Sequence, residues 1–253
     1  MSNILDKYGI KEVADVVFYK IDSSGNPTVP VLYLDTLKVS TIEQTAENSS
    51  ARGGKGNPEL ISWDYNKEIT VTLEDALFSA KSMAIMYGSV DQDGDAIINE
   101  GTDGAMSIRK TFPKSAVSED KKVTIFGKTY DIPAEAVYYK ADGTTGSATE
   151  FDFVTFNMAA AGQEIVISSA TFPGTYYITG DTYARSEITG EDEFFQFILP
   201  KAKIQSEVTL TMEAEGDPST FSMNLKVLRP ADGKMMKLVK YSLTGAASAS
   251  LLN

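Results

Sequence analysis

The chain has 253 residues and a formal net charge of −12, from 35 acidic and 23 basic residues. It contains neither cysteine nor histidine, which excludes disulfide bonds, catalysis by a thiolate or an imidazole, and the common structural zinc sites. A chain of this length can bury a sizeable core, often within one all-β domain, and its acidity argues against a surface built to grip nucleic acid.

The first part of the chain alternates between strand patterns and turn residues. Residues 2–10 predict a short helix or an arm. Two strands are expected at 12–20 and 31–42, joined by the turn-rich stretch 22–27. A polar, glycine-rich loop is expected at 48–58.

The most regular pattern is an alternation of apolar and polar residues from Ile61 to Glu74. The odd positions are apolar except for Lys67, and the even positions include Asp64 and Glu68. Such a strand would span about 45 Å at about 3.3 Å per residue, whereas typical strands hold about five or six residues. The pattern therefore favours a barrel, or an assembly in which sheets continue between subunits.

One helix is expected after this strand. Ser79 is suited to be its N-cap, and Gly88 to be its C-terminal stop. The residues predicted to share its apolar face are Ala80, Met83, Ala84 and Tyr87.

From residue 89 to residue 150 the chain is richer in turns, and we expect an outward-facing surface hairpin there. Short strands are predicted at 106–112, 122–126, 136–140, 151–156, 164–168 and 175–186. No repeat or low-complexity linker divides the chain. The sequence predicts one domain, residues 1–253, that is mainly β: a sandwich or barrel of long antiparallel strands with one short packed helix.

The C-terminal quarter, residues 194–241, has the clearest hairpin signal. Polar and apolar residues alternate from Val208 to Ala214, and again from Phe221 to Val227. The turn 216–219 separates the two runs, a pattern typical of a hairpin with one buried face. A second turn leads into a last strand at 234–241.

Two segments resemble the tail tube proteins of long-tailed bacteriophages, siphoviruses or myoviruses. They are GEDEFFQFILPKAKIQSEVTLTMEAEGDPSTFSMNLKVLRPADGKMMKLVKY, residues 190–241, and GGKGNPELISWDYNKEITVTLEDALFSAKSMAIMYGS, residues 53–89. The resemblance implies a tail-tube-like fold and a virion structural protein, not an enzyme, whose hexameric rings stack into a hollow tube through which DNA passes. It also implies self-assembly, contacts with sheath, tape-measure and tail terminator proteins, and no cofactor. The residues themselves show no apolar run long enough to span a bilayer and no signal peptide pattern, so we expect synthesis in the host cytoplasm and no membrane.

The loop at 48–58 contains a glycine-rich stretch around Lys55, a composition also found in loops that bind phosphate. A Walker loop needs serine or threonine after the lysine and then a helix, but Gly56 follows here and a strand comes next. A flexible loop is one alternative. The resemblance implies another, a contact between successive rings, with Arg52, Gly54, Lys55, Asn57 and Glu59 as the residues involved.

An acidic lumen would repel the phosphate backbone of passing DNA. The candidate lumen acids are Asp64, Glu68 and Glu74 on the long strand. The residues do not say which face of that strand lines the bore.

Asp91, Asp93 and Asp95 have the spacing that opens a calcium-binding loop. The rest of the motif is missing, because Ala96 replaces the glycine and Thr102 replaces the bidentate glutamate. We expect a solvated turn, with weak cation binding as the alternative.

Neighbouring acids at 74–75, 119–120 and 191–193 select no catalytic pair, because adjacent side chains on a strand point to opposite faces. Trp63 and the aromatic pairs at 138–139, 176–177 and 194–195 could stack on a sugar, but one member of each pair is expected in the core. These features leave an alternative function, an extracellular β-sandwich module that binds carbohydrate or calcium. The N-terminus counts against it, since no basic region followed by an apolar stretch predicts a signal peptide.

Overall fold

The computed structural model describes residues 7–10, 12–208 and 220–241. The chain divides into two compact units: unit 1 comprises residues 1–98 and 165–253, and unit 2 comprises residues 99–164. The sequence predicts one domain with a surface hairpin within 89–150. In the structure unit 2 is more than a hairpin, because it has two sheets and a core of its own.

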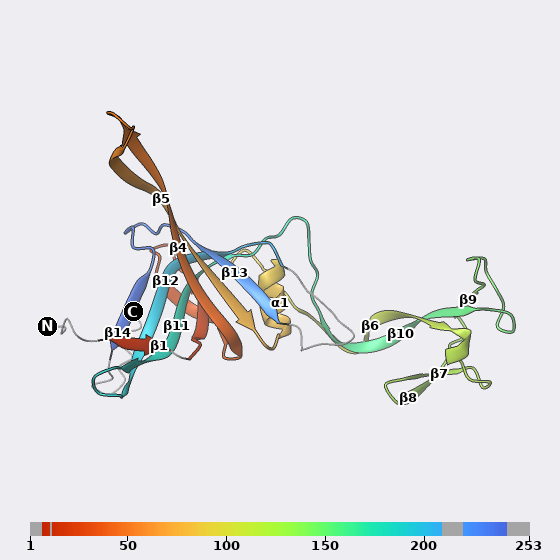
Figure 1. The fold of residues 1–253 in the computed structure, drawn as a ribbon. Coiled ribbons are helices and arrows are strands. Elements are labelled where there is room, and N and C mark those ends of the chain that lie inside the picture. Colours follow the sequence, from red (N-terminus) through yellow and green to blue (C-terminus); the bar gives the residue numbers. More distant parts are fainter. Residues whose placement is uncertain (1–6, 11, 209–219, 242–253) are drawn as a thin grey trace. The chain divides into compact units, whose positions relative to one another are not determined.

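Unit 1 is a large antiparallel sheet with one helix (Figure 1). Within the described residues, nine strands pair in the order β3-β2-β11-β12-β13-β5-β4, with β1 on β11 and β14 on β12. The elements are β1 (Tyr8–Ile10), β2 (Asp15–Ile21), β3 (Pro27–Leu34), β4 (Leu37–Arg52), β5 (Glu59–Asp75), α1 (Ala80–Tyr87), β11 (Thr175–Ser186), β12 (Asp192–Ile204), β13 (Phe221–Val227) and β14 (Lys237–Tyr241). The prediction of a mainly β fold with one short helix is confirmed.

The core of unit 1 lies on one face of this sheet. Side chains alternate across a strand, and β11 shows this clearly, because Tyr176 and Ile178 are buried while Tyr177 is only partly so. In β13 the alternation buries Phe221 and Leu225, the latter completely. The period of two in the sequence thus identifies the buried positions of both strands.

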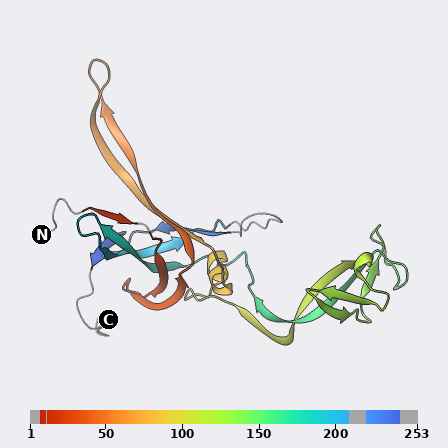
Figure 2. The same ribbon diagram turned by 60° about the horizontal axis from the view of Figure 1, so that its bottom comes forward.

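Helix α1 packs beside the sheet (Figure 2) and has the predicted ends. The backbone N–H of Ser82 donates to Ser79 Oγ at 3.0 Å, and that of Ser79 donates to Ser82 Oγ at 2.9 Å, which forms a capping box. Gly88 ends the helix with a φ of 76°, the left-handed conformation that suits glycine.

The predicted apolar face of α1 is wrong apart from Ala84. The buried residues are Ser82, Ala84, Ile85 and Met86. Met83 and Tyr87 of the predicted face are only partly buried. Ile85 and Met86 pack into the core of unit 1 instead, so the shape of that core decides which apolar stripe of the short helix faces inward.

Several strand boundaries differ from the predictions. The sequence predicts a short helix or an arm at 2–10, but residues 8–10 form the strand β1 and pair with β11. The strand expected at 31–42 is two strands, β3 and β4. The strand expected at 164–168 is absent from the described structure beyond Glu164. The run 209–214 and the turn 216–219 lie outside the described residues.

Unit 2 contains a three-stranded sheet, β6-β10-β9, and a separate hairpin, β7–β8. Its elements are β6 (Asn99–Pro113), the 3-10 helix Lys114–Ala116, β7 (Lys122–Ile125), β8 (Lys128–Asp131), β9 (Val137–Tyr139) and β10 (Phe153–Glu164). Phe156 stacks on Phe112 with ring centroids 5.7 Å apart, and Tyr138 meets Phe151 edge-on at 5.0 Å. Unit 2 therefore buries aromatic side chains of its own.

The two ends of unit 2 are neighbours. Asn99, the first residue of β6, pairs in register with Glu164, the last residue of β10. The Asn99 side-chain amide also donates to Glu164 Oε2 at 3.1 Å. The chain thus leaves for unit 2 and returns from it at adjacent positions.

Candidate functional site: the β4–β5 hairpin

The strands β4 and β5 have 16 and 17 residues and form one long hairpin (Figure 1). The strand predicted at Ile61–Glu74 is confirmed and is slightly longer. Residues 70–75 of β5 lie between β4 and β13, whereas residues 59–69 pair only with β4 within the described residues. We call residues 47–65 the distal hairpin, since this part has no third strand.

The turn of this hairpin is shorter than the loop expected at 48–58, because β4 continues to Arg52. Figure 2 shows the turn at the tip of the hairpin. Two backbone hydrogen bonds close the turn, from the Gly53 N–H to the Pro58 carbonyl at 3.2 Å and from the Asn57 N–H to the Gly54 carbonyl at 3.1 Å. Gly54 and Asn57 have φ values of 85° and 50°. Glycine adopts such angles without steric cost, and asparagine tolerates them.

The five predicted contact residues fall into three groups. Arg52 and Glu59 face each other across the strands, and Arg52 Nη2 lies 3.1 Å from Glu59 Oε2. Both are well exposed, so this ion pair adds little stability. Gly54 and Asn57 shape the backbone of the turn. Lys55 is exposed in the turn and has no ion pair within the described residues.

A β-bulge divides the hairpin. Thr45 pairs with Glu68 and Glu47 pairs with Tyr65, so Ala46 alone faces two residues, Asn66 and Lys67. Asn66 has a φ of 51°. The extra residue reverses the side of the ribbon to which the odd residues of β5 point.

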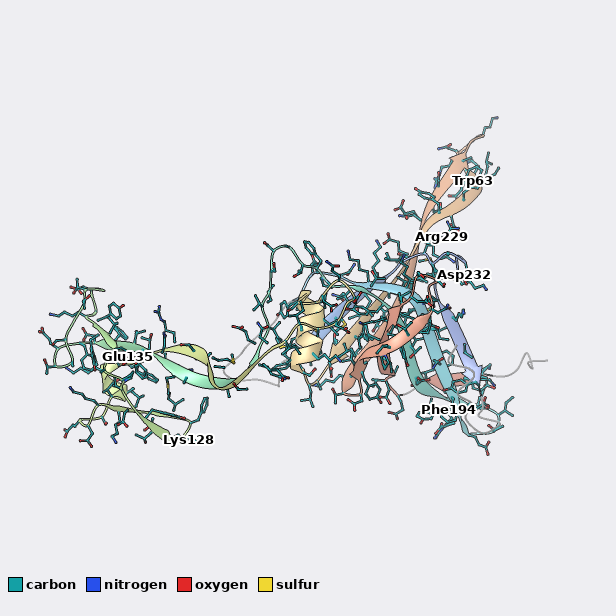
Figure 3. The ribbon with its side chains drawn as sticks, turned by 180° about the vertical axis from the view of Figure 1, so that it is seen from behind. Trp63, Lys128, Glu135, Phe194, Arg229 and Asp232 are labelled. Atoms are coloured by element: carbon teal, nitrogen blue, oxygen red, sulfur yellow. The ribbon has the colours of Figure 1, made fainter. Side chains whose placement is uncertain are left out.

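The reversal changes the surroundings of the apolar residues. Ile69, opposite Gln44, is buried in the core of unit 1. Beyond the bulge the odd residues lie on the other face, and there they are exposed: Ile61, Trp63 and Tyr65, at 53%, 54% and 50%. We call these three residues the apolar row; Figure 3 shows Trp63 on the hairpin.

The other face of the distal hairpin is polar and internally bonded. Asn48 pairs in register with Asp64, and its amide donates to Asp64 Oδ1 at 3.1 Å and also to Ser62 Oγ. The distal hairpin therefore has one apolar face and one polar face.

The bulge also separates the candidate lumen acids. Asp64 lies on the polar face of the distal hairpin, whereas Glu68 and Glu74 lie on the side of β5 that points away from the core. Glu68 pairs with Lys226 of β13 at 2.8 Å. The structure thus does not bring the three acids onto one face, although the unbroken alternation in the sequence suggested it.

The apolar row is the feature that sequence reasoning missed as a contact surface. Alternation alone assigns it to the same face as Ile69. One signal in the sequence could have indicated the bulge. Lys67 interrupts the apolar positions, and it directly follows Asn66, a residue type that tolerates positive φ.

The turn that resembles a calcium loop is held by the protein itself. Asp91 Oδ1 accepts hydrogen bonds from the backbone N–H groups of Asp93 and Asp95, each at 2.9 Å. Lys20 Nζ lies 2.6 Å from Asp95 Oδ2, and this hydrogen bond is the main reason that the pKa of Lys20 is raised. Across the described part of the chain, no group of three acidic side chains is placed to hold a metal ion.

Tyr176 anchors the same turn from the core, since its hydroxyl donates to the Gly94 carbonyl at 3.0 Å. Burial, with the nearby carboxylates of Asp95 and Asp91, raises the pKa of Tyr176 to about 12. An unfolded tyrosine has a pKa of about 10. Between these two values the unfolded state binds fewer protons than the native state, so the free energy of unfolding falls as pH rises.

We therefore expect Tyr176 to contribute stability that is fully present below about pH 10 and decreases by about 1.4 kcal/mol per pH unit between pH 10 and 12. Tyr176→Phe should remove this part of the slope, although the lost hydrogen bond lowers stability by about 1 kcal/mol at neutral pH. Urea denaturation of both proteins at several pH values measures the difference. Equal slopes above pH 10 would contradict the assignment.

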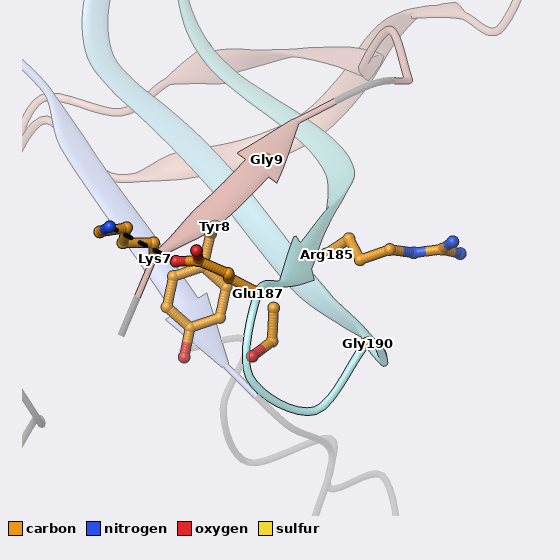
Figure 4. Close-up of a pocket in the computed structure, with 7 residues that line it drawn as sticks. Lys7, Tyr8, Gly9, Arg185, Glu187 and Gly190 are labelled. Carbon is orange, nitrogen blue, oxygen red and sulfur yellow. Dashed lines mark ion pairs between the residues drawn. The ribbon is translucent and has the colours of Figure 1, made fainter. Parts of the chain in front are cut away.

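An open hollow lies beside β1 in unit 1 (Figure 4). Lys7 Nζ lies 3.6 Å from Glu187 Oε2, and the Arg185 guanidinium makes two bonds of 2.7 Å to Asp192. The charged side chains here pair with one another at the surface. Such an arrangement resembles solvated ion pairs rather than an enclosed site for a small molecule.

No helix in the described residues is both apolar enough and long enough to span a bilayer.

The comparisons with known proteins agree with the resemblance read from the sequence. The model of the YomU/Tube protein family matches residues 8–240. The chain is also 24% identical over 250 residues to a tail tube protein of Bacillus phage SPR, with 91% of this chain and 87% of that protein covered. The match covers unit 1 and unit 2 alike, and the chain therefore belongs to the YomU/Tube protein family.

Proposed function

We propose that this chain is the subunit of a bacteriophage tail tube, and that its rings stack into a hollow tube through which DNA passes. The observation that carries the proposal is the β4–β5 hairpin, which extends beyond its own sheet and exposes an apolar row there. A protein that acts alone rarely exposes such a row on an unsupported ribbon. Membership of the family and the tail tube relative support the same function.

The charge of the chain suits passage of DNA. A ring of six subunits carries six times the −12 of each chain, about −72. The side of β5 and β13 that points away from the core is polar, with Glu68, Glu74 and the hydrogen bond from Thr72 Oγ1 to Asn224 Oδ1 at 3.0 Å. Glu68 is paired with Lys226, and Lys203 lies in register with Lys226 on this side, so the surface is polar rather than strongly acidic. The repulsion of phosphates, which would release the DNA, therefore rests on the net charge of the whole ring.

The tube lies in the virion tail, and the subunit is made in the host cytoplasm and acts without a cofactor or membrane. Its further partners are tape-measure and tail terminator proteins, with a sheath where the tail is contractile. Its role is structural rather than enzymatic.

The turn at the end of the hairpin provides the first test. Replacing Gly53, Gly54, Lys55 and Gly56 with alanine forces alanines into positive φ at Gly54 and Gly56 and removes the exposed cation. We expect rings to form but stacking into tubes to fail, as seen by negative-stain electron microscopy and sedimentation. Gly143→Ala is the matched control, since Gly143 has a φ of 83° and open space around it but lies in unit 2.

Two outcomes would count against the proposal in different ways. Normal tube growth by the alanine variant would show that the turn has no part in stacking. Wild-type protein that stays monomeric, and gains thermal stability with millimolar calcium, would overturn the tube function and favour the extracellular binding module.

A further inference from the structure

The apolar row is a one-sided surface created by the bulge. On its own face the row lies across from Glu47, Ser49 and Ala51 of β4, and Glu47 accepts a hydrogen bond from the Asn66 side chain at 2.8 Å. The opposite face satisfies its polar groups internally through Asn48. With Ile61, Trp63 and Tyr65 exposed on it, this side of the distal hairpin gains more free energy by leaving water than the Asn48–Asp64 side.

A ribbon of two strands without a packed face is only marginally stable in water. The distal hairpin has no other strand beside it within the described residues. A second surface that covers the apolar row would both order the ribbon and bury tryptophan and tyrosine, the residue types most frequent at the centres of protein interfaces.

We infer that the apolar row docks on a second copy of this chain, with Trp63 at the centre of the contact and the Asn48–Asp64 face left in water. This inference rests on the proposed function and specifies which face of the hairpin makes the contact. The charge argues for this geometry, because copies that each carry −12 repel one another and meet most easily where uncharged apolar side chains dominate.

The bulge is what makes the contact available. Without the extra residue in β5, the alternation of the sequence would direct Trp63 to the same side as the buried Ile69. The single residue added at Asn66 and Lys67 therefore allows one strand to supply the core of its own subunit and the interface of the next.

Trp63 is the only tryptophan in the chain, so its fluorescence reports this one position. In dilute protein shown by sedimentation to be monomeric, we expect emission at long wavelength and ready quenching by acrylamide. In tubes verified by electron microscopy, the emission should move to shorter wavelength and the quenching should fall.

A pair of variants tests the face. The double variant Ile61→Ser/Tyr65→Ser keeps the tryptophan and removes the flanking apolar side chains. We expect it to raise the critical concentration for assembly at least about tenfold, because burying one large apolar side chain changes an association constant by more than tenfold. Asp64→Ser changes the opposite face of the same strand and should leave assembly unchanged. Far-ultraviolet circular dichroism checks that both variants keep the fold of the monomer.

The outcomes separate the two hypotheses. Two results would overturn the inference and leave the tube function standing. One is that Trp63 remains fully quenchable in tubes. The other is that Asp64→Ser disturbs assembly whereas the double variant Ile61→Ser/Tyr65→Ser does not. Wild-type protein that does not self-associate at any concentration would overturn both.

Discussion

Phe156→Ala is expected to lower the free energy of unfolding of unit 2 by about 3–5 kcal/mol, the usual cost of removing a buried phenylalanine side chain. Phe156 is only 5% exposed and stacks on Phe112. Unit 2 has 66 residues, and domains of that size are stable by roughly 3–10 kcal/mol. The substitution should therefore unfold much or all of unit 2 while unit 1, which has its own core, stays folded.

Hydrogen exchange followed by mass spectrometry measures this directly, because peptides from residues 99–164 should lose protection and peptides from β11 and β13 should keep it. Phe153→Ala is the matched control, since Phe153 lies on the same strand but is 43% exposed. Equal loss of protection in both units would show that the chain unfolds as one cooperative body.

Gly180→Ala is expected to destabilise unit 1 by about 3 kcal/mol, at the upper end for overpacking. Gly180 of β11 pairs in register with Phe197 of β12. A Cβ at residue 180 would overlap two atoms of the Phe197 ring, and that ring is buried. The ring cannot swing into water without loss of its own burial, so the sheet or the core must shift.

Gly9→Ala is the control for this substitution, because Gly9 also lies in a strand but has no atom within 4 Å of the added Cβ. Urea denaturation should show a change within about 0.5 kcal/mol for Gly9→Ala. Combining Gly180→Ala with Phe197→Leu should recover part of the lost stability. A small effect of Gly180→Ala alone would mean that the core around Phe197 is looser than the structure indicates.

Local sequence patterns predicted much of unit 1. The alternation in β5, β11 and β13 reflects a sheet with one buried face, and the caps of α1 follow from the orphan backbone groups at helix ends. The face of α1 did not follow from its pattern, since an eight-residue helix offers two overlapping apolar stripes. Only the surrounding core decides between them.

Unit 2 was harder to predict because its core is assembled from distant positions. Phe112, Val123 and Phe156 come from three different strands, β6, β7 and β10, which are far apart in the sequence. No composition change marks residues 99 and 164 as boundaries, so the turn-rich segment suggested only a hairpin.

For the candidate site, the residue types indicated the turn and its exposed Lys55. They did not indicate which face of the distal hairpin carries the apolar side chains. Arg52 and Glu59 proved to be partners of each other, which depends on the register of the two strands. The exposure of Trp63 depends on a single unpaired residue. The alternation of apolar and polar residues does not reveal such a bulge, so it cannot show which residues of the strand face the core beyond it.

The paired ends of unit 2 have a consequence for the history and use of this protein. Because Asn99 and Glu164 are cross-strand neighbours, one insertion or deletion in the gene can add, remove or exchange everything between them without moving the flanking segments apart. Domains joined to a host at such a point are tolerated best, since the host does not have to open. The same junction is where a foreign domain could be grafted, one copy for every subunit.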